Sequence, residues 1–181
     1  MHFPTALSLV VTAAGFAAAT PLEGLAAPRV NAATVQQSGG FKDMILTEIH
    51  TKTLAAANAT ADNRQISFHL SDPNFNTSTT CATTWLDSPN ATTLPSSYIP
   101  CAANPGVKES YRWFFDSYTG LGEFGLQLAH AYSDPDNYPA PWDVVGLFAT
   151  ANVTLSCKEG GAECKLGEGE SVRTPINAAV N

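Results

Sequence analysis

The stretch QISFHLSDP, from Gln65 to Pro73, alternates apolar and polar residues and then ends in Ser-Asp-Pro. Successive side chains of an extended strand point to opposite faces, so Ile66, Phe68 and Leu70 share one face. The alternation therefore predicts a half-buried β-strand. Pro73 ends it, because proline cannot donate a hydrogen bond to a neighbouring strand.

The same alternation recurs in the segments 44–53, 110–118, 123–132 and 146–157. Turn-forming residues, such as TGLG at 119–122 and EGG at 159–161, separate these segments, and no segment after residue 19 keeps helical spacing over three turns. Short alternating strands between turns are typical of all-β domains. We predict an antiparallel β-barrel or sandwich of short strands.

The N-terminal residues predict export. ALSLVVTAAGFAAA, from Ala6 to Ala19, is an apolar run of signal-peptide length that ends in small residues. We expect a signal peptide at 1–19, a flexible segment at 20–40, one β-barrel domain at 41–166 and a flexible tail at 167–181. Within this tail, SVRTPI is a candidate for a short edge strand. The mature protein is expected to be extracellular and not a membrane protein, because a spanning helix needs roughly 20 apolar residues.

Charge and glycosylation motifs agree with an extracellular protein. The formal net charge is −7 and the sequence pI about 4.9, with no basic patch, so nucleic acid and anionic membranes are unsuitable partners. The motif Asn-x-Ser/Thr, an acceptor for N-linked glycans, occurs at Asn58, Asn76, Asn90 and Asn152. In its alternating segment, Asn152 falls on the polar face.

The cysteines predict two disulfides. An even number of cysteines behind a signal peptide indicates a disulfide framework, and Cys81, Cys101, Cys157 and Cys164 allow three connectivities. We favour the sequence-local pairs Cys81–Cys101 and Cys157–Cys164, because CKEGGAEC has the composition of a hairpin tip whose ends are joined. A zinc site is disfavoured by the absence of a C-x-x-C motif.

Ser-Asp-Pro occurs in two histidine-bearing segments, which raises the alternative of a paired catalytic site. In a strand, His69 and Asp72 point to opposite faces, whereas His130 and Asp134 would share one. The two units therefore lack a common geometry. We interpret both as strand-ending turns, in which the aspartate bonds its own turn backbone, and His130 as a hydrogen-bonded core histidine.

Candidate binding residues are few. Trp85 and Trp142 lie in loop-like segments and are candidates for binding a phenolic or carbohydrate ligand. A metal site is an alternative if His50, His69 and His130 come from neighbouring strands and converge. We predict no catalytic residue, no cofactor and no bound metal.

Two other functions stay open as alternatives. A small secreted hydrolase of the ribonuclease type could combine His50 and Glu48 with Arg64 or Arg112. A cell-wall carbohydrate-binding module would use Trp85 and Trp142 as a stacking surface.

Two acidic motifs are weaker candidates. Asp116 and Glu123 flank a hairpin, as a glycosidase-like carboxylate pair could. DPDN at 134–137 matches the start of a calcium loop, but Tyr138 occupies the third ligand position. Both are interpreted as solvated turn residues.

Taken together, the chain resembles the Alternaria major allergen (Alt a I) family of small secreted fungal proteins. The resemblance covers roughly residues 41–165 and rests on the order of segments: AAATPLE, ISFHLSDPN, Cys81, Cys101, YRWFF, EFGLQLAHAY, and NVTLSC before Cys164. It implies an antiparallel β-barrel held by two sequence-local disulfides. Unlike the prototype, which has an additional cysteine near its mature N-terminus, this chain has no cysteine before Cys81, so no disulfide-linked dimer is expected.

The resemblance also implies a function. Members of this family are non-enzymatic and act by surface recognition, as effectors or elicitors or as binders of small ligands. The implied partners are plant defence proteins, small phenolic ligands or cell-wall glycans.

Overall fold

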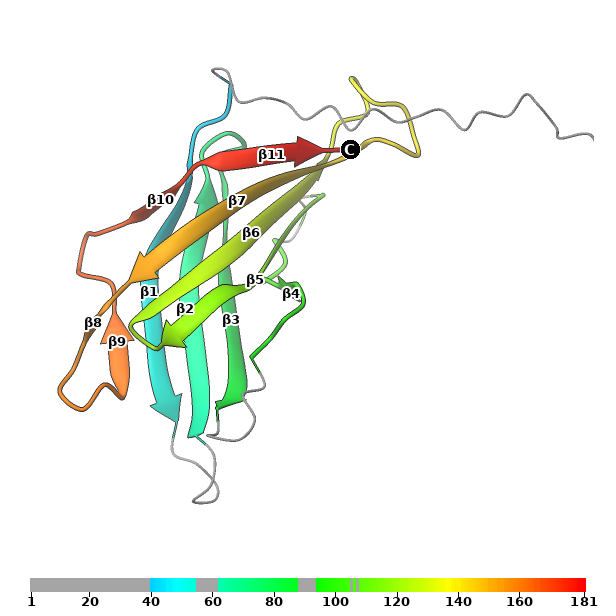
Figure 1. Cartoon of the computed structure of the whole chain (residues 1–181). Helices are drawn as coiled ribbons and strands as arrows, with labels where there is room; N and C mark the ends of the chain where they lie inside the picture. Colours follow the sequence, from blue (N-terminus) through cyan, green and yellow to red (C-terminus); the bar gives the residue numbers. More distant parts are fainter. Residues whose placement is uncertain (1–39, 55–61, 88–93, 105, 107) are drawn as a thin grey trace, which may run out of the picture. The chain divides into compact units, whose positions relative to one another are not determined.

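The computed structural model describes residues 40–54, 62–87, 94–104, 106 and 108–181, and it confirms the all-β prediction. The described strands form two antiparallel sheets that pack against each other (Figure 1). The first sheet has the order β3-β2-β1-β9-β8, with β10 also paired to β1; the second has the order β11-β7-β6-β5-β4. The arrangement is a sandwich rather than one closed barrel, and the described residues include no helix.

The strands of the first sheet are β1 (Met44–Leu54), β2 (Asp62–Asp72), β3 (Thr77–Asp87), β8 (Ser156–Cys157), β9 (Glu163–Lys165) and β10 (Val172–Thr174). Those of the second are β4 (Ile99–Pro100), β5 (Glu109–Gly120), β6 (Glu123–Ser133), β7 (Val144–Thr154) and β11 (Ile176–Val180).

The core lies between the inner faces of the two sheets. The alternating residues Ile66, Phe68 and Leu70 of β2 are buried, as their spacing predicts. Phe68 meets Trp113 of the opposite sheet edge to face, with ring centroids 5.2 Å apart. The faces of the remaining long strands contribute the other large buried side chains: Met44, Leu46, Ile49, Leu126, Leu128, Leu147 and Val153.

A β-bulge in β1 changes which residues face the core. Thr47 pairs with His69 and His50 pairs with Ser67, so β1 has one more residue than β2 between these two pairs. Glu48 has a φ of 53°, a left-handed conformation that bulges tolerate. After Leu46, the next side chain of β1 that faces the core is therefore Ile49, three residues on instead of two, and His50 points to the outer face.

The C-terminal residues correct one expectation. The segment 167–181 is not a loose tail, because β10 pairs with β1 and β11 pairs with β7. Thr174, Ile176 and Ala179 are buried. The chain thus crosses from one sheet to the other at this side of the sandwich (Figure 1), and the β domain extends beyond the predicted boundary at residue 166.

A second connection crosses the opposite side. The Cys101 backbone N–H donates to Tyr111 of β5, and the Ala102 backbone N–H donates to Thr80 of β3. The disulfide Cys81–Cys101 ties the same segment to β3, and Cys157–Cys164 joins β8 to β9. Both predicted pairs are confirmed, and no cysteine is free.

Strand β3 corrects a second expectation. Its sequence, TSTTCATTWLD, is rich in threonine, and Trp85 was predicted to lie in a loop. In the structure the segment pairs with β2 along its whole length and turns Thr79, Cys81 and Trp85 inward. Threonine is β-branched and suits a strand whose outer face is polar.

Candidate functional site

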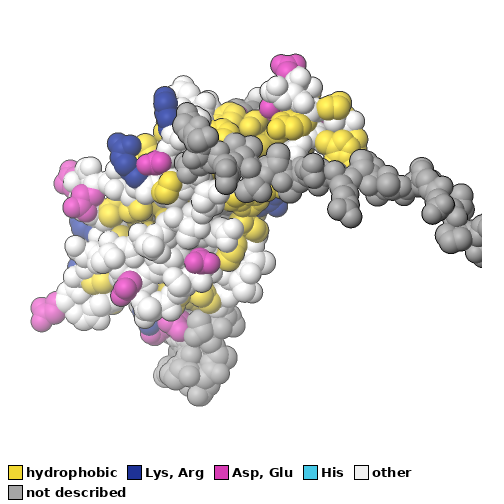
Figure 2. All heavy atoms as spheres, turned by 45° about the horizontal axis from the view of Figure 1, so that its top comes forward, with side chains coloured by type: hydrophobic (Ala, Val, Ile, Leu, Met, Phe, Trp, Pro, Cys, Tyr) yellow, Lys and Arg dark blue, Asp and Glu magenta, His cyan; other side chains and the backbone are white. Residues whose placement is uncertain are grey.

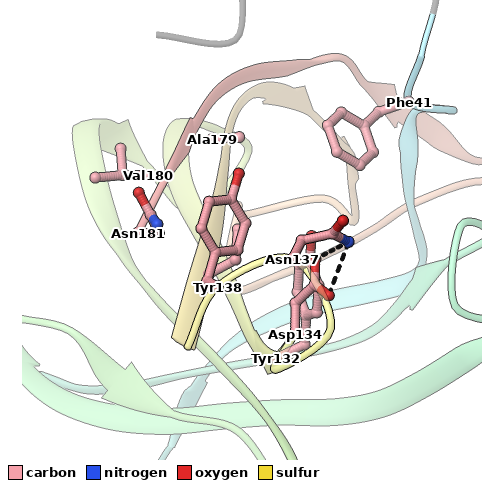
Figure 3. Close-up of a pocket in the computed structure, with 9 residues that line it drawn as sticks. Phe41, Tyr132, Asp134, Asn137, Tyr138, Ala179, Val180 and Asn181 are labelled. Carbon is pink, nitrogen blue, oxygen red and sulfur yellow. Dashed lines mark hydrogen bonds between the residues drawn. The ribbon is translucent and has the colours of Figure 1, made fainter. Parts of the chain in front are cut away.

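The candidate site is a pocket of 440 Å³ at the end of the sandwich where the loop between β6 and β7 leaves the sheets. It is lined by Phe41, Tyr132, Asp134, Asn137, Tyr138, Val145, Ala179, Val180 and Asn181. In Figure 3 the rings of Phe41 and Tyr138 stand on either side of the pocket. The residues come from the segment before β1, the end of β6, the following loop, β7, β11 and the residue after β11.

Hydrogen bonds order the loop that carries Tyr138. The Asp134 backbone N–H donates to Asp143, closing the base of the loop, and the Tyr138 N–H donates to the Asp134 carbonyl at 3.0 Å. The Asn137 amide donates to both carboxylate oxygens of Asp134 at 3.0 Å each (Figure 3). These bonds order the backbone at Tyr138 and orient the Asp134 carboxylate.

Exposed apolar side chains occur on the loop and strands that contribute to the pocket. Trp142 is 55% exposed, Val144 56% and Val180 43%. Figure 2 shows hydrophobic side chains gathering toward the end of the molecule from which the β6–β7 loop projects. Exposed apolar groups around a hollow are typical of recognition surfaces.

Tyr132 separates the pocket from a buried polar cluster below it. Burial raises the pKa of the Tyr132 phenol, and the nearby Asp134 carboxylate raises it further. Its ring packs against Phe75 at a centroid distance of 4.3 Å, and Phe75 in turn meets His130 edge to face at 4.8 Å.

The buried cluster is centred on His130 of β6, whose side chain is fully buried. Its Nδ1 lies 2.8 Å from Asp72 Oδ2 at the end of β2, and its Nε2 lies 3.1 Å from Glu109 Oε2 at the start of β5. The ring stacks on Tyr111 with centroids 4.1 Å apart. The contact with Asp72 joins β2 of the first sheet to the second sheet, to which both His130 and Glu109 belong.

The outer members of the cluster are hydroxyl groups. Thr77 Oγ1 donates to Glu109 Oε2 at 2.8 Å, and the Tyr111 hydroxyl bonds to the same threonine oxygen. Burial raises the pKa of the Tyr111 phenol, and the charges of Asp72 and Glu109 add to the increase.

This cluster corrects the interpretation of the two Ser-Asp-Pro motifs. Asp72 does order its own turn, because its Oδ1 accepts from the Asn74 backbone N–H at 2.9 Å. Its other oxygen, however, bonds His130 from the second histidine-bearing segment. The two segments therefore do meet. His130 is a hydrogen-bonded core histidine, as predicted.

The three histidines do not converge. His130 faces the core, whereas His69 lies partly exposed on the outer face of the first sheet. His50 pairs with Glu163 of β9 at 3.1 Å. Within the described part of the chain, no group of three or more His, Cys, Asp or Glu side chains could hold a metal ion.

The two candidate tryptophans have different environments. Trp85 is only 3% exposed and packs against Phe115 in the core, with ring centroids 5.2 Å apart. Trp142 is exposed in the loop between β6 and β7. They form no shared stacking surface, because Trp85 is buried in the core and Trp142 is exposed.

The two arginines of the ribonuclease alternative, Arg64 and Arg112, contact other residues. Arg64 pairs with Asp62 at 2.8 Å and with Asp87 at 3.4 Å. Arg112 lies over the Tyr98 ring on the second sheet, 5.4 Å from its centroid.

Glu163, the partner of His50, is also bound by a lysine. A hydrogen bond from Lys158 holds the pKa of the Glu163 carboxyl below its usual range, and the bond from His50 adds to this. The pair lies at the surface of β9, away from the enclosed cluster of His130.

The remaining predicted sites are exposed where the structure describes them. Asp116, Glu123 and Asn152 are exposed, as is Asn76, which lies in the turn between β2 and β3 with a φ of 54°. Asn58 and Asn90 lie outside the described residues, as do the predicted signal peptide and residues 20–39. The described residues contain no helix that is long and apolar enough to cross a membrane.

Comparisons of the chain with models of known protein families, with curated proteins and with solved structures find no match. The fold and the pocket therefore define this molecule as a disulfide-bonded β-sandwich with an aromatic pocket at one end.

Proposed function

We propose that the chain is a secreted, non-enzymatic binding protein that holds a small planar phenolic ligand in the pocket between Phe41 and Tyr138. The observation that carries the proposal is the preformed, aromatic-lined pocket. Its 440 Å³ falls within the range of small-molecule sites, which are typically mostly apolar with a few fixed polar groups.

The lining suits a phenol in two ways. Aromatic side chains can stack on or meet the edge of a flat ring, an interaction of about 0.5–1.5 kcal/mol beyond the burial of area. The Asp134 carboxylate receives two bonds from Asn137 and, because an ionised carboxylate has about four acceptor positions, can also accept a phenol O–H.

A binding role is supported over the hydrolase alternative by the separation of the histidines. His130 is enclosed in the core, and His50 is engaged with Glu163 on another surface. The two disulfides support an extracellular location, where such bonds persist. The exposed apolar side chains, such as Trp142, offer a surface to a protein partner, such as the plant defence proteins that the family resemblance implies.

The proposal is tested with protein secreted by a eukaryotic host from the full sequence. Its mass is expected to show a chain that starts at Thr20 and carries N-linked glycan. Titration with 2-naphthol, a fluorescent phenol, is expected to saturate at one site, and Tyr138→Ser should weaken binding about tenfold, equivalent to about 1.4 kcal/mol.

Tyr98→Ser is the matched control. Tyr98 is also a partly buried tyrosine, but it packs on Phe114 of the second sheet and does not line the pocket. Equal losses in the two variants, or no saturable binding by the wild type, would exclude the pocket as a phenol site. Ribonuclease activity that is lost on His50→Ala would instead favour the hydrolase, and binding of a cell-wall glycan that is lost on Trp142→Ala would favour the carbohydrate module.

A further inference from the structure

The charge at the pocket comes from carboxylates. Of the nine described residues that line the pocket, Asp134 is the one Asp or Glu, and none is Lys or Arg. The β6–β7 loop, residues 134–143, adds Asp136 and Asp143 and contains no basic residue. Asp134 is partly buried, so its charge is screened less by water than that of an exposed group.

Two lysines are close to the lining residues in the chain but do not line the pocket. Lys42 follows Phe41 and is exposed. Lys108 lines a separate hollow, together with Glu109, and this hollow shares only Tyr132 with the pocket. The side chains on the pocket wall therefore give it a negative potential without a compensating cation.

The phenol of Tyr132 shows that this potential acts on the pocket wall. Burial raises the pKa of the Tyr132 phenol, and the Asp134 carboxylate raises it further. The carboxylate does so because a negative charge disfavours a phenolate beside it. A ligand at the same wall experiences the same potential, which disfavours an anion and favours a cation.

The aromatic rings favour the same sign of charge. Phe41, Tyr132 and Tyr138 line the pocket together with Asp134 (Figure 3). The face of an aromatic ring is negative and attracts a cation within about 6 Å of its centre. Asn137 donates to both oxygens of Asp134, and the remaining acceptor positions can receive an ammonium N–H, a stronger donor than a neutral hydroxyl.

We propose that the pocket selects its ligand by charge: it prefers phenols that carry an ammonium group to neutral phenols, and it disfavours phenolic acids. The ammonium group lies against Asp134, and the phenol ring lies between Phe41 and Tyr138. This inference rests on the proposed function, because it names the class of phenol that the same pocket binds.

Three ligands with the same ring test the selectivity in the wild type. Tyramine, 4-ethylphenol and 3-(4-hydroxyphenyl)propanoate carry a positive, a neutral and a negative side chain at neutral pH. Their affinities are measured by isothermal titration calorimetry in 0.15 M salt, where charges farther than about 8 Å from the ligand contribute little. Tyramine should bind about tenfold more tightly than 4-ethylphenol, through one cation–π contact and one ion pair, and the propanoate should bind most weakly.

The outcomes separate this inference from the proposed function. Saturable binding of the three ligands with equal affinities, or with the propanoate bound most tightly, would overturn the selectivity and leave a phenol site. Failure of all three to bind would overturn both proposals.

Asp134→Asn tests the source of the selectivity, because it removes the charge and keeps one acceptor oxygen. The preference for tyramine over 4-ethylphenol should fall from about tenfold to less than twofold. Asp136→Asn is the matched control: it removes the same charge from the same loop, but Asp136 is exposed and does not line the pocket. The control should keep the wild-type preference.

Equal losses of preference in the two variants, or an unchanged preference in Asp134→Asn, would overturn the role of Asp134. The comparison of the three ligands in the wild type needs no variant, so it decides the proposal even if Asp134→Asn fails to fold.

Discussion

Tyr111 shows how a single residue connects packing with proton chemistry. It is 4% exposed, stacks on His130 and bonds Thr77 through its hydroxyl group. Burial raises the pKa of its phenol above the ordinary value of about 10. The folded protein therefore keeps a proton that the unfolded chain loses, so this contribution to stability is intact below about pH 10 and is lost as the pH rises further.

Tyr111→Phe separates the two roles. At pH 7 the variant should be less stable by about 0.5–1.5 kcal/mol, because Thr77 loses a hydrogen-bond partner. Above pH 10 the wild type should lose stability more steeply than the variant. Urea unfolding at both pH values measures the difference. Parallel curves for the two proteins above pH 10 would show that Tyr111 titrates normally in the fold.

At the scale of elements, the turn between β5 and β6 is packed against the β8–β9 hairpin. Leu155 donates its backbone N–H to the Gly122 carbonyl, and Thr51 donates its hydroxyl to the Leu121 carbonyl. A Cβ atom at Gly122 would lie 2.8 Å from Cys157 Sγ, and the disulfide to Cys164 restrains that sulfur. Glycine is required here by the close approach of two hairpins.

Gly122→Ala should therefore destabilise the protein by about 1–3 kcal/mol, the usual cost of overpacking. Gly120→Ala, two residues earlier, is the control because a Cβ there meets nothing within 4 Å. Replacing both Cys157 and Cys164 with alanine should reduce the cost of Gly122→Ala, since the clash is with the disulfide. Equal unfolding free energies for the two glycine variants would contradict this explanation.

At the scale of the whole molecule, the two disulfides join different parts of the fold. Cys81–Cys101 spans 20 positions and anchors the segment that crosses between the sheets, and Cys81 is fully buried. Cys157–Cys164 spans 7 positions within a single hairpin, and Cys157 is exposed. A longer closed loop restricts the unfolded chain more, by about 1 kcal/mol between these two lengths.

The pair Cys81→Ala and Cys101→Ala should accordingly cost at least about 1 kcal/mol more stability than the pair Cys157→Ala and Cys164→Ala. Each double variant leaves a cavity at one buried position, Cys81 or Cys164, so the difference in loop length decides the order. Urea unfolding of the two double variants, with the wild type as reference, provides the comparison. The opposite order of stabilities would show that the crossing segment near Cys101 is held by its other contacts.

The sequence by itself determined the strands with strong alternation, and with them the fold class. Ile66, Phe68 and Leu70 are inward because side-chain direction in a strand is a local property with a period of two. Asn152 is outward for the same reason. The same rule does not reveal β3, whose threonines carry a weaker contrast between its faces, or the bulge at Glu48, which changes the phase inside one strand.

The tertiary structure alone decided the candidate sites. Asp72 and His130 are 58 positions apart, and each belongs to a segment whose pattern also fits a plain strand end. The pocket likewise combines Phe41, Tyr138 and Ala179 from distant parts of the chain. Such contacts depend on which strands pair and how the sheets face each other. Periodicity along the sequence specifies the faces of a strand but not its neighbours, so the partners appear only when the sheets are assembled.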